Sequence, residues 1–99
     1  MKPREFLEVD PASLHLPGSR RDGVDPVKLH RQRLRHGTSI DAMPPIEVKR
    51  GAYGELVIYD GVTTATRVAK YLPGTLVTVE VTGQLKTPVA ALPKVGEKL

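Results

Sequence analysis

The sequence predicts a small α+β domain in which helices pack on a mixed β-sheet. Two amphipathic helical patterns alternate with short strand patterns, and proline and glycine turns separate them. The hydrophobic fraction of 39% in 99 residues suffices for one small aliphatic core. No internal repeat divides the chain, so we expect a single domain over residues 1–99 with an irregular C-terminal segment at about 83–99.

The N-terminal part contains one clear strand pattern. Residues 6–9, three apolar side chains and Glu8, predict a short strand that Asp10 and Pro11 end. Residues 13–16 either extend this strand or form a turn of helix, and the pattern leaves both alternatives open. Proline and glycine then predict a loop over residues 17–23.

A basic helix is expected to begin at Pro26. Asp25 can accept the free N–H groups at a helix start, and proline suits the first helical position because its missing N–H is not needed there. Gly37 is a favoured residue just past a helix end. One side of this helix carries Val27, His30 and Leu34, and another side carries Lys28, Arg31 and Arg35.

Two strands are expected to follow the basic helix. Residues 38–42 are polar and form at most a short turn, after which Pro44 and Pro45 favour extended chain. Apolar and charged residues alternate over 46–49, which is typical of a half-buried strand. After a hairpin-like loop, residues 56–59 are apolar without alternation, so we expect this strand in the middle of the sheet.

The second helix has the cleanest apolar stripe in the chain. It is expected over about residues 63–72, with Ala65, Val68, Ala69 and Leu72 at helical spacing. Pro73 and Gly74 end it, and alternating valines at 77, 79 and 81 predict a closing strand over residues 75–82.

Composition narrows the functional classes. The chain has no cysteine, which excludes disulfides, thiol chemistry and cysteine-based zinc sites. The longest apolar runs are too short to cross a bilayer, and the N-terminus lacks a secretory hydrophobic region. We therefore expect a cytoplasmic protein without a membrane partner. The residues identify no cofactor, and the modest core is compatible with an oligomer.

The net charge of +4 comes from one segment. Residues 20–36 hold six Lys or Arg residues against two Asp residues, while the rest of the chain is balanced. A cluster of this kind can attract phosphates, and the Lys28, Arg31 and Arg35 side is a candidate nucleic-acid surface. The alternative without a binding function is a solvated helix face, on which basic residues near the C-terminal end interact favourably with the helix dipole.

The most informative segment is the turn between the expected buried strand and the second helix. Asp60 and Gly61 are followed by Thr63, Thr64 and, one turn later, Arg67. Free backbone N–H groups, hydroxyls and a positive helix end would then point at one spot, which suits a phosphate or a carboxylate. In the alternative interpretation a threonine only caps the helix and Arg67 points into solvent.

The expected basic helix is followed by the segments MPPIEVKR and GELVIYDG, then by the second helix and the segment LVTVEV. In this order and spacing, the stretch from Pro26 to Val81 resembles the N-terminal domain of the ParB family, which shares its fold with sulfiredoxin. The resemblance implies a bacterial protein in which the strand-to-helix turn handles phosphates, so a nucleotide or nucleic acid is the expected partner. Asp60-Gly61 matches the superfamily frame, but threonines stand where histidine and arginine are usual, and no sulfiredoxin-type cysteine is present.

The resemblance and the residues leave two alternatives. Some ParB-like domains are described as nucleases, and a metal-assisted nuclease would draw on Asp60, Glu55 and Asp41. A single loop carboxylate beside glycine more often forms only a turn, and His30 and His36 lack metal-ligand spacing, so we expect no metal site. The other alternative is a non-catalytic interaction module, or an effector or toxin domain. Whether the chain is an enzyme stays open, and no catalytic residue is assigned.

Overall fold

A computed structural model describes residues 3–37, 39–41 and 43–99 of the chain, and it has the expected α+β class. Strand β1 (Glu5–Val9) is followed by two short 3-10 helices, η1 (Pro11–Ser13) and η2 (Gly18–Arg20). The remaining elements in chain order are α1 (Pro26–His36), β2 (Ile46–Arg50), β3 (Leu56–Asp60), α2 (Val62–Tyr71), β4 (Val77–Gln84) and η3 (Val95–Lys98). Residues 38 and 42 of the expected polar turn lie outside the described residues.

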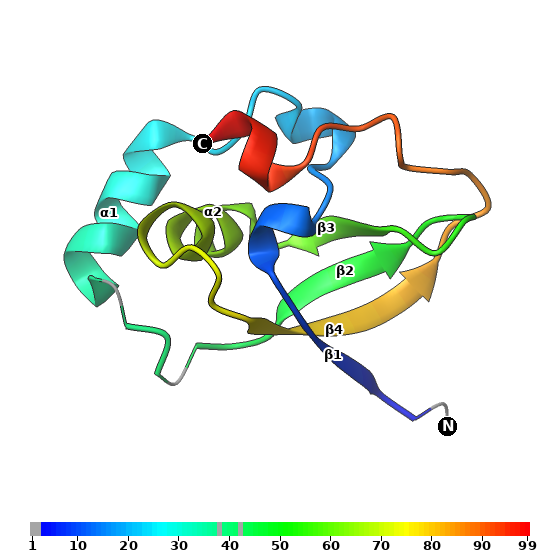
Figure 1. The fold of residues 1–99 in the computed structure, drawn as a ribbon, viewed down its shortest axis with the longest axis horizontal. Helices are drawn as coiled ribbons and strands as arrows, with labels where there is room; N and C mark the ends of the chain where they lie inside the picture. The colour runs from blue at the N-terminus through cyan, green and yellow to red at the C-terminus, as the bar shows by residue number, and fades with distance from the viewer. Residues whose placement is uncertain (1–2, 38, 42) are drawn as a thin grey trace.

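The four strands form one mixed sheet in the order β1-β4-β2-β3. β4 pairs antiparallel with β1 and parallel with β2, and β2 pairs antiparallel with β3 across the hairpin loop. Figure 1 shows α2 and η3 on one side of this sheet, with α1 beside α2. The core fills the space between the sheet and this layer.

The core consists of aliphatic side chains from both layers. Ile46, Val48, Ile58 and Val79 on the strands meet Val68 on α2, and all of them are almost fully buried. Alternation along β2 and β4 puts Ile46, Val48 and Val79 on one face of the sheet, as the period of two predicts. The apolar stripe of α2 is therefore confirmed as the face that packs on the sheet.

The expected central position of residues 56–59 is wrong, because β3 lies at the end of the strand order. Its outer edge is covered by residues 14–16. The amide of His15 donates to the Leu56 carbonyl at 2.9 Å, and the amide of Ile58 donates to the His15 carbonyl at 2.9 Å. Neither alternative for residues 13–16 holds over the whole stretch, because Ser13 ends η1 and residues 14–16 form a separate extended segment against β3. This cover explains why the sequence of an edge strand has the pattern of a strand buried on both faces.

The C-terminal segment completes this cover. The amide of Leu16 donates to the Pro93 carbonyl at 2.7 Å, and the amide of Val95 donates to the Leu14 carbonyl at 2.9 Å. Val95 is buried in the core, so this largely irregular segment has a packing role.

Helix α1 begins and ends where the sequence predicts. The Asp25 carboxylate accepts the Val27 amide at 2.9 Å, and the amide of Gly37 donates to the Arg33 carbonyl at 2.7 Å. Only Leu29 is buried, whereas Val27 and Leu34 on the neighbouring side are exposed. α1 thus packs on α2 through a narrow contact and leaves most of its basic surface open.

Within the described residues, no helix is both long enough and apolar enough to traverse a bilayer.

Candidate functional site

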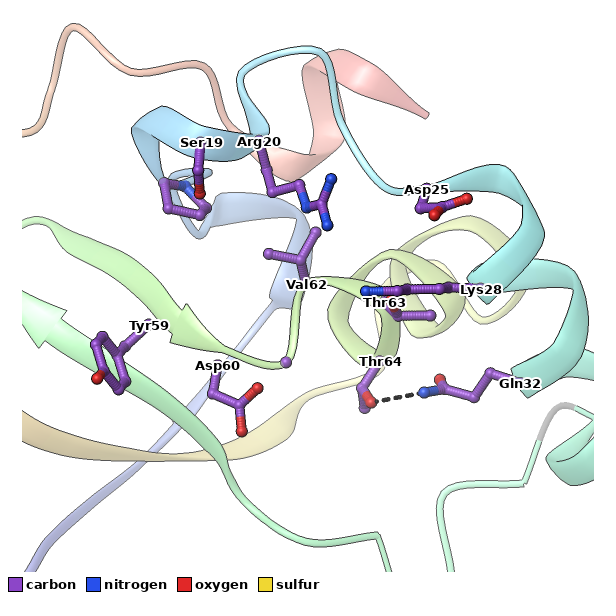
Figure 2. A pocket seen from close by; sticks show the side chains of 12 residues that line it. Ser19, Arg20, Asp25, Lys28, Gln32, Tyr59, Asp60, Val62, Thr63 and Thr64 are labelled. Carbon is purple, nitrogen blue, oxygen red and sulfur yellow. Dashed lines mark hydrogen bonds between the residues drawn. The ribbon is translucent and has the colours of Figure 1, made fainter.

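A pocket of about 380 Å³ lies at the junction of β3 and α2. Its wall combines the end of β3 and the first turn of α2 with side chains from η2 and α1 (Figure 2). Its polar lining includes Arg20, Lys28, Gln32, Asp60, Thr63 and Thr64. Four of the five residues assigned from sequence to the phosphate site, Asp60, Gly61, Thr63 and Thr64, line this pocket.

Gly61 forms the floor of the turn and starts α2. Its φ of 116° lies in the left-handed region, and a Cβ at this position would stand 3.1 Å from Ile46 Cγ2. The amide of Ala65 donates to the Gly61 carbonyl at 2.9 Å, so the amides of Val62, Thr63 and Thr64 precede the first hydrogen bond of the helix. Glycine offers no capping side chain, and these donors stay available to a ligand.

Two cations from separate elements extend toward this turn. Arg20 comes from η2 and Lys28 from α1, and Figure 2 shows both side chains directed at the first turn of α2. Asp25 and Asp60 also line the pocket, so its charged side chains balance formally; Asp60 points away from Arg20 in the same view, and Asp25 caps α1. Arg20, Lys28 and the positive end of the α2 dipole lie together at the first turn of α2.

The threonines of the first turn have different roles. Thr66 is buried, and its hydroxyl donates to the Val62 carbonyl at 2.8 Å. Thr64 instead accepts a hydrogen bond from Gln32 Nε2 at 3.0 Å, across the contact between the two helices (Figure 2). The hydroxyls of Thr63 and Thr64 belong to residues that line the pocket, whereas that of Thr66 serves the helix backbone.

Arg67, which the sequence predicts in the phosphate site, does not line this pocket but a neighbouring hollow that shares Gln32 and Thr64 with it. Its side chain is only 2% exposed, so the alternative of an arginine in solvent is also wrong. Nε donates to Gln32 Oε1 at 2.8 Å, and Nη1 donates to the carbonyls of Ser39 at 2.8 Å and Gly37 at 3.3 Å. Burial lowers the pKa of Arg67 from its ordinary value, because the charged form loses hydration. Burial of the Arg67 side chain could not be predicted from the sequence, because arginine is rarely buried without a carboxylate partner.

The three residues assigned to nucleic acid lie together on the exposed side of α1. Lys28, Arg31 and Arg35 line a hollow of about 340 Å³. This hollow adjoins the first pocket and shares Lys28, Gln32 and Thr63 with it. The cationic surface thus continues from the α2 turn along α1.

The carboxylates considered for a metal are dispersed. Asp60 lines the pocket, Glu55 Oε1 accepts the Tyr53 amide at 3.2 Å in the hairpin loop, and Asp41 lines a different hollow beside Arg67. Among the residues that the structure describes, no group of three or more His, Asp or Glu side chains could hold a metal ion.

Sequence reasoning missed Arg20 and Gln32 as members of the site. Arg20 lies within the basic segment, so charge density could have suggested it, but only the fold brings η2 next to α2. Gln32 is polar on an already polar helix, and no sequence pattern distinguishes it.

No protein-family model matches this chain, and none of the curated proteins matches it in sequence.

Proposed function

We propose that this protein binds a phosphate-bearing ligand, a nucleotide or a nucleic acid, in the pocket at the first turn of α2. The observation that carries the proposal is the convergence of Arg20 and Lys28 on a helix start that has no capping side chain. Backbone N–H groups and the helix dipole favour an anion at such a position, and two cations from other elements strengthen that preference. The resemblance of the Asp60-Gly61 turn to that of ParB/sulfiredoxin-like domains, in which this turn meets phosphates, supports the same proposal.

The adjoining hollow on α1 supports a ligand with more than one phosphate. Lys28 belongs to both hollows, and Arg31 and Arg35 continue the positive surface beyond it. A phosphate held at the α2 turn would leave the next phosphate of a nucleotide or a strand near these cations. Contacts of this kind depend strongly on salt and carry little sequence preference.

Charge-removal variants test the proposal. Binding of a nucleoside triphosphate panel and of short single-stranded DNA is measured by isothermal titration calorimetry at several salt concentrations. Arg20→Gln and Lys28→Gln are each expected to weaken binding, and each should lower the salt slope by about one unit if it contacts a phosphate.

Lys86→Gln is the matched control. Lys86 is exposed, lies outside both hollows and loses the same single charge. Equal losses for Lys86→Gln and Lys28→Gln would mean that only net charge matters, and the pocket proposal would then be wrong.

A further inference from the structure

Thr64 is connected to the buried Arg67 through one side-chain amide. Gln32 on α1 receives the Nε–H of Arg67 on its Oε1 at 2.8 Å and donates from Nε2 to Thr64 Oγ1 at 3.0 Å. Gln32 and Thr64 line the pocket, whereas the buried Arg67 does not line it and borders only the neighbouring hollow that shares Gln32 and Thr64. The three side chains therefore form a chain of hydrogen bonds from the interior to the pocket wall.

Hydrogen-bond chemistry fixes the direction of this chain. A guanidinium has donors only, so the Gln32 atom that meets Arg67 has to be the oxygen. The other end of the amide is then an NH₂ group, which also only donates, and Thr64 Oγ1 has to accept from it. The proton of the Thr64 hydroxyl points elsewhere as a result.

Arg67 is anchored well enough to hold that direction. Its Nη1 donates to two backbone carbonyls beyond the end of α1, those of Gly37 and Ser39, and the side chain is almost completely buried. Reversing the Gln32 amide would bring its NH₂ donors against the donors of Arg67. Thr66 turns its hydroxyl back to a helix carbonyl, but within the part of the chain that the structure describes Thr64 forms no such bond.

We infer that Arg67 and Gln32 are positioning residues that make the Thr64 hydroxyl a hydrogen-bond donor toward the pocket, and that the site thereby selects an oxyanion that only accepts hydrogen bonds. This inference rests on the proposed function. Sulfate has this character, and so do the unprotonated oxygens of a phosphate group, whereas a group that presents its own O–H to Thr64 does not. Arg67 thus acts on the ligand through Gln32, without touching it.

The test is Gln32→Glu, a nearly isosteric change that reverses the polarity of the chain. The new carboxylate accepts from Arg67 and also from Thr64, so the hydroxyl proton turns away from the pocket. Binding of inorganic phosphate, followed by amide chemical shifts at low ionic strength, is expected to weaken about tenfold or more. The thermal unfolding midpoint is expected to hold or rise, because a buried arginine gains a carboxylate. A purely structural role for Gln32 predicts that stability and binding change together.

Thr64→Val and the double variant separate the hydroxyl from the added charge. If Gln32 acts through Thr64, Gln32→Glu weakens phosphate binding clearly less in the Thr64→Val background than in the original chain. Equal effects in both backgrounds mean that the new charge alone acts, and the inference is then overturned. Unchanged binding in Thr64→Val overturns it as well.

The hydrogen-bond chain is observable without a ligand. Slowly exchanging Arg67 Nε–H and Gln32 Nε2 protons are expected in nitrogen-edited NMR spectra of the free protein. Fast exchange at both groups, with phosphate binding intact, would overturn the positioning role while the proposed function stands. Protected protons in a chain that binds no phosphate would reject the proposed function and, with it, the role of these residues.

Discussion

Replacement of Arg67 by alanine is expected to destabilise the fold. Alanine keeps the helix propensity of α2, so the loss arises from tertiary contacts. The variant removes the donors to Gln32 Oε1 and to the carbonyls of Gly37 and Ser39, and it leaves a gap between α1, α2 and the loop that follows α1. Replacing an arginine that pointed into solvent would leave the free energy of unfolding almost unchanged.

The size of the effect follows from these contacts. A buried acceptor left without a partner costs about 1–3 kcal/mol. Ser39 is exposed and Gly37 partly so, which lets water replace some of the lost hydrogen bonds. Removal of a buried charge offsets part of the loss, since no carboxylate lies within ion-pair range of Arg67 among the described residues. We therefore expect a decrease of about 2–3 kcal/mol in the free energy of unfolding.

The assay is thermal and urea unfolding followed by circular dichroism. For a domain of this size the expected decrease corresponds to a midpoint about 8–24 °C lower. Arg67→Met is the control, because it fills most of the volume without donors and so separates the cavity from the hydrogen bonds. A decrease below about 0.5 kcal/mol, as for a surface residue, would refute the buried placement of Arg67.

Three further predictions test other parts of the structure. Leu16→Ala is expected to cost about 2–5 kcal/mol because Leu16 is fully buried, whereas Leu34→Ala should stay within about 0.5 kcal/mol; similar values in urea unfolding would contradict the cover that residues 14–16 give β3. Gly61→Ala should cost more than Gly37→Ala, because both glycines have positive φ but only at Gly61 does a Cβ meet Ile46; an equal loss of melting temperature would contradict that contact. The Arg4 guanidinium donates to Glu80 and holds the pKa of that carboxyl below its usual range, so this stabilisation is present above pH about 4 and is lost as the pH falls through the lowered pKa. Glu80→Gln should therefore be less stable than the original chain at neutral pH and approach it in acid, whereas a difference that does not change with pH would argue against the ion pair.

Local patterns predicted much of this fold. The start and end of α1 follow from Asp25, Pro26 and Gly37, and the stripe of α2 follows from its spacing, because capping and periodicity act over a few residues. The position of β3 could not be predicted in the same way. An apolar run looks the same whether its cover is a neighbouring strand or the segment at residues 14–16.

The residues of the candidate site also fall into two groups, those that local sequence patterns predict and those that long-range packing brings in. The turn at Asp60 and Gly61 is visible in sequence because glycine and a helix start leave a local pattern. Arg20 lines the pocket because the chain between β1 and α1 passes next to the start of α2. The Arg67 side chain is buried because backbone carbonyls that follow α1 accept its hydrogen bonds. Long-range packing decided both, and single-sequence periodicity contains no information about it.

The central claim is that the first turn of α2 holds a phosphate. The most direct measurement is a titration of nitrogen-15-labelled protein with inorganic phosphate and with a nucleoside triphosphate at low salt, monitored by amide chemical shifts. If the phosphate binds at this turn, saturable shifts are expected that are largest at Gly61, Val62, Thr63 and Thr64, with smaller shifts around Arg20 and Lys28. Shifts that are absent from this turn, or that concentrate on another surface, would contradict it.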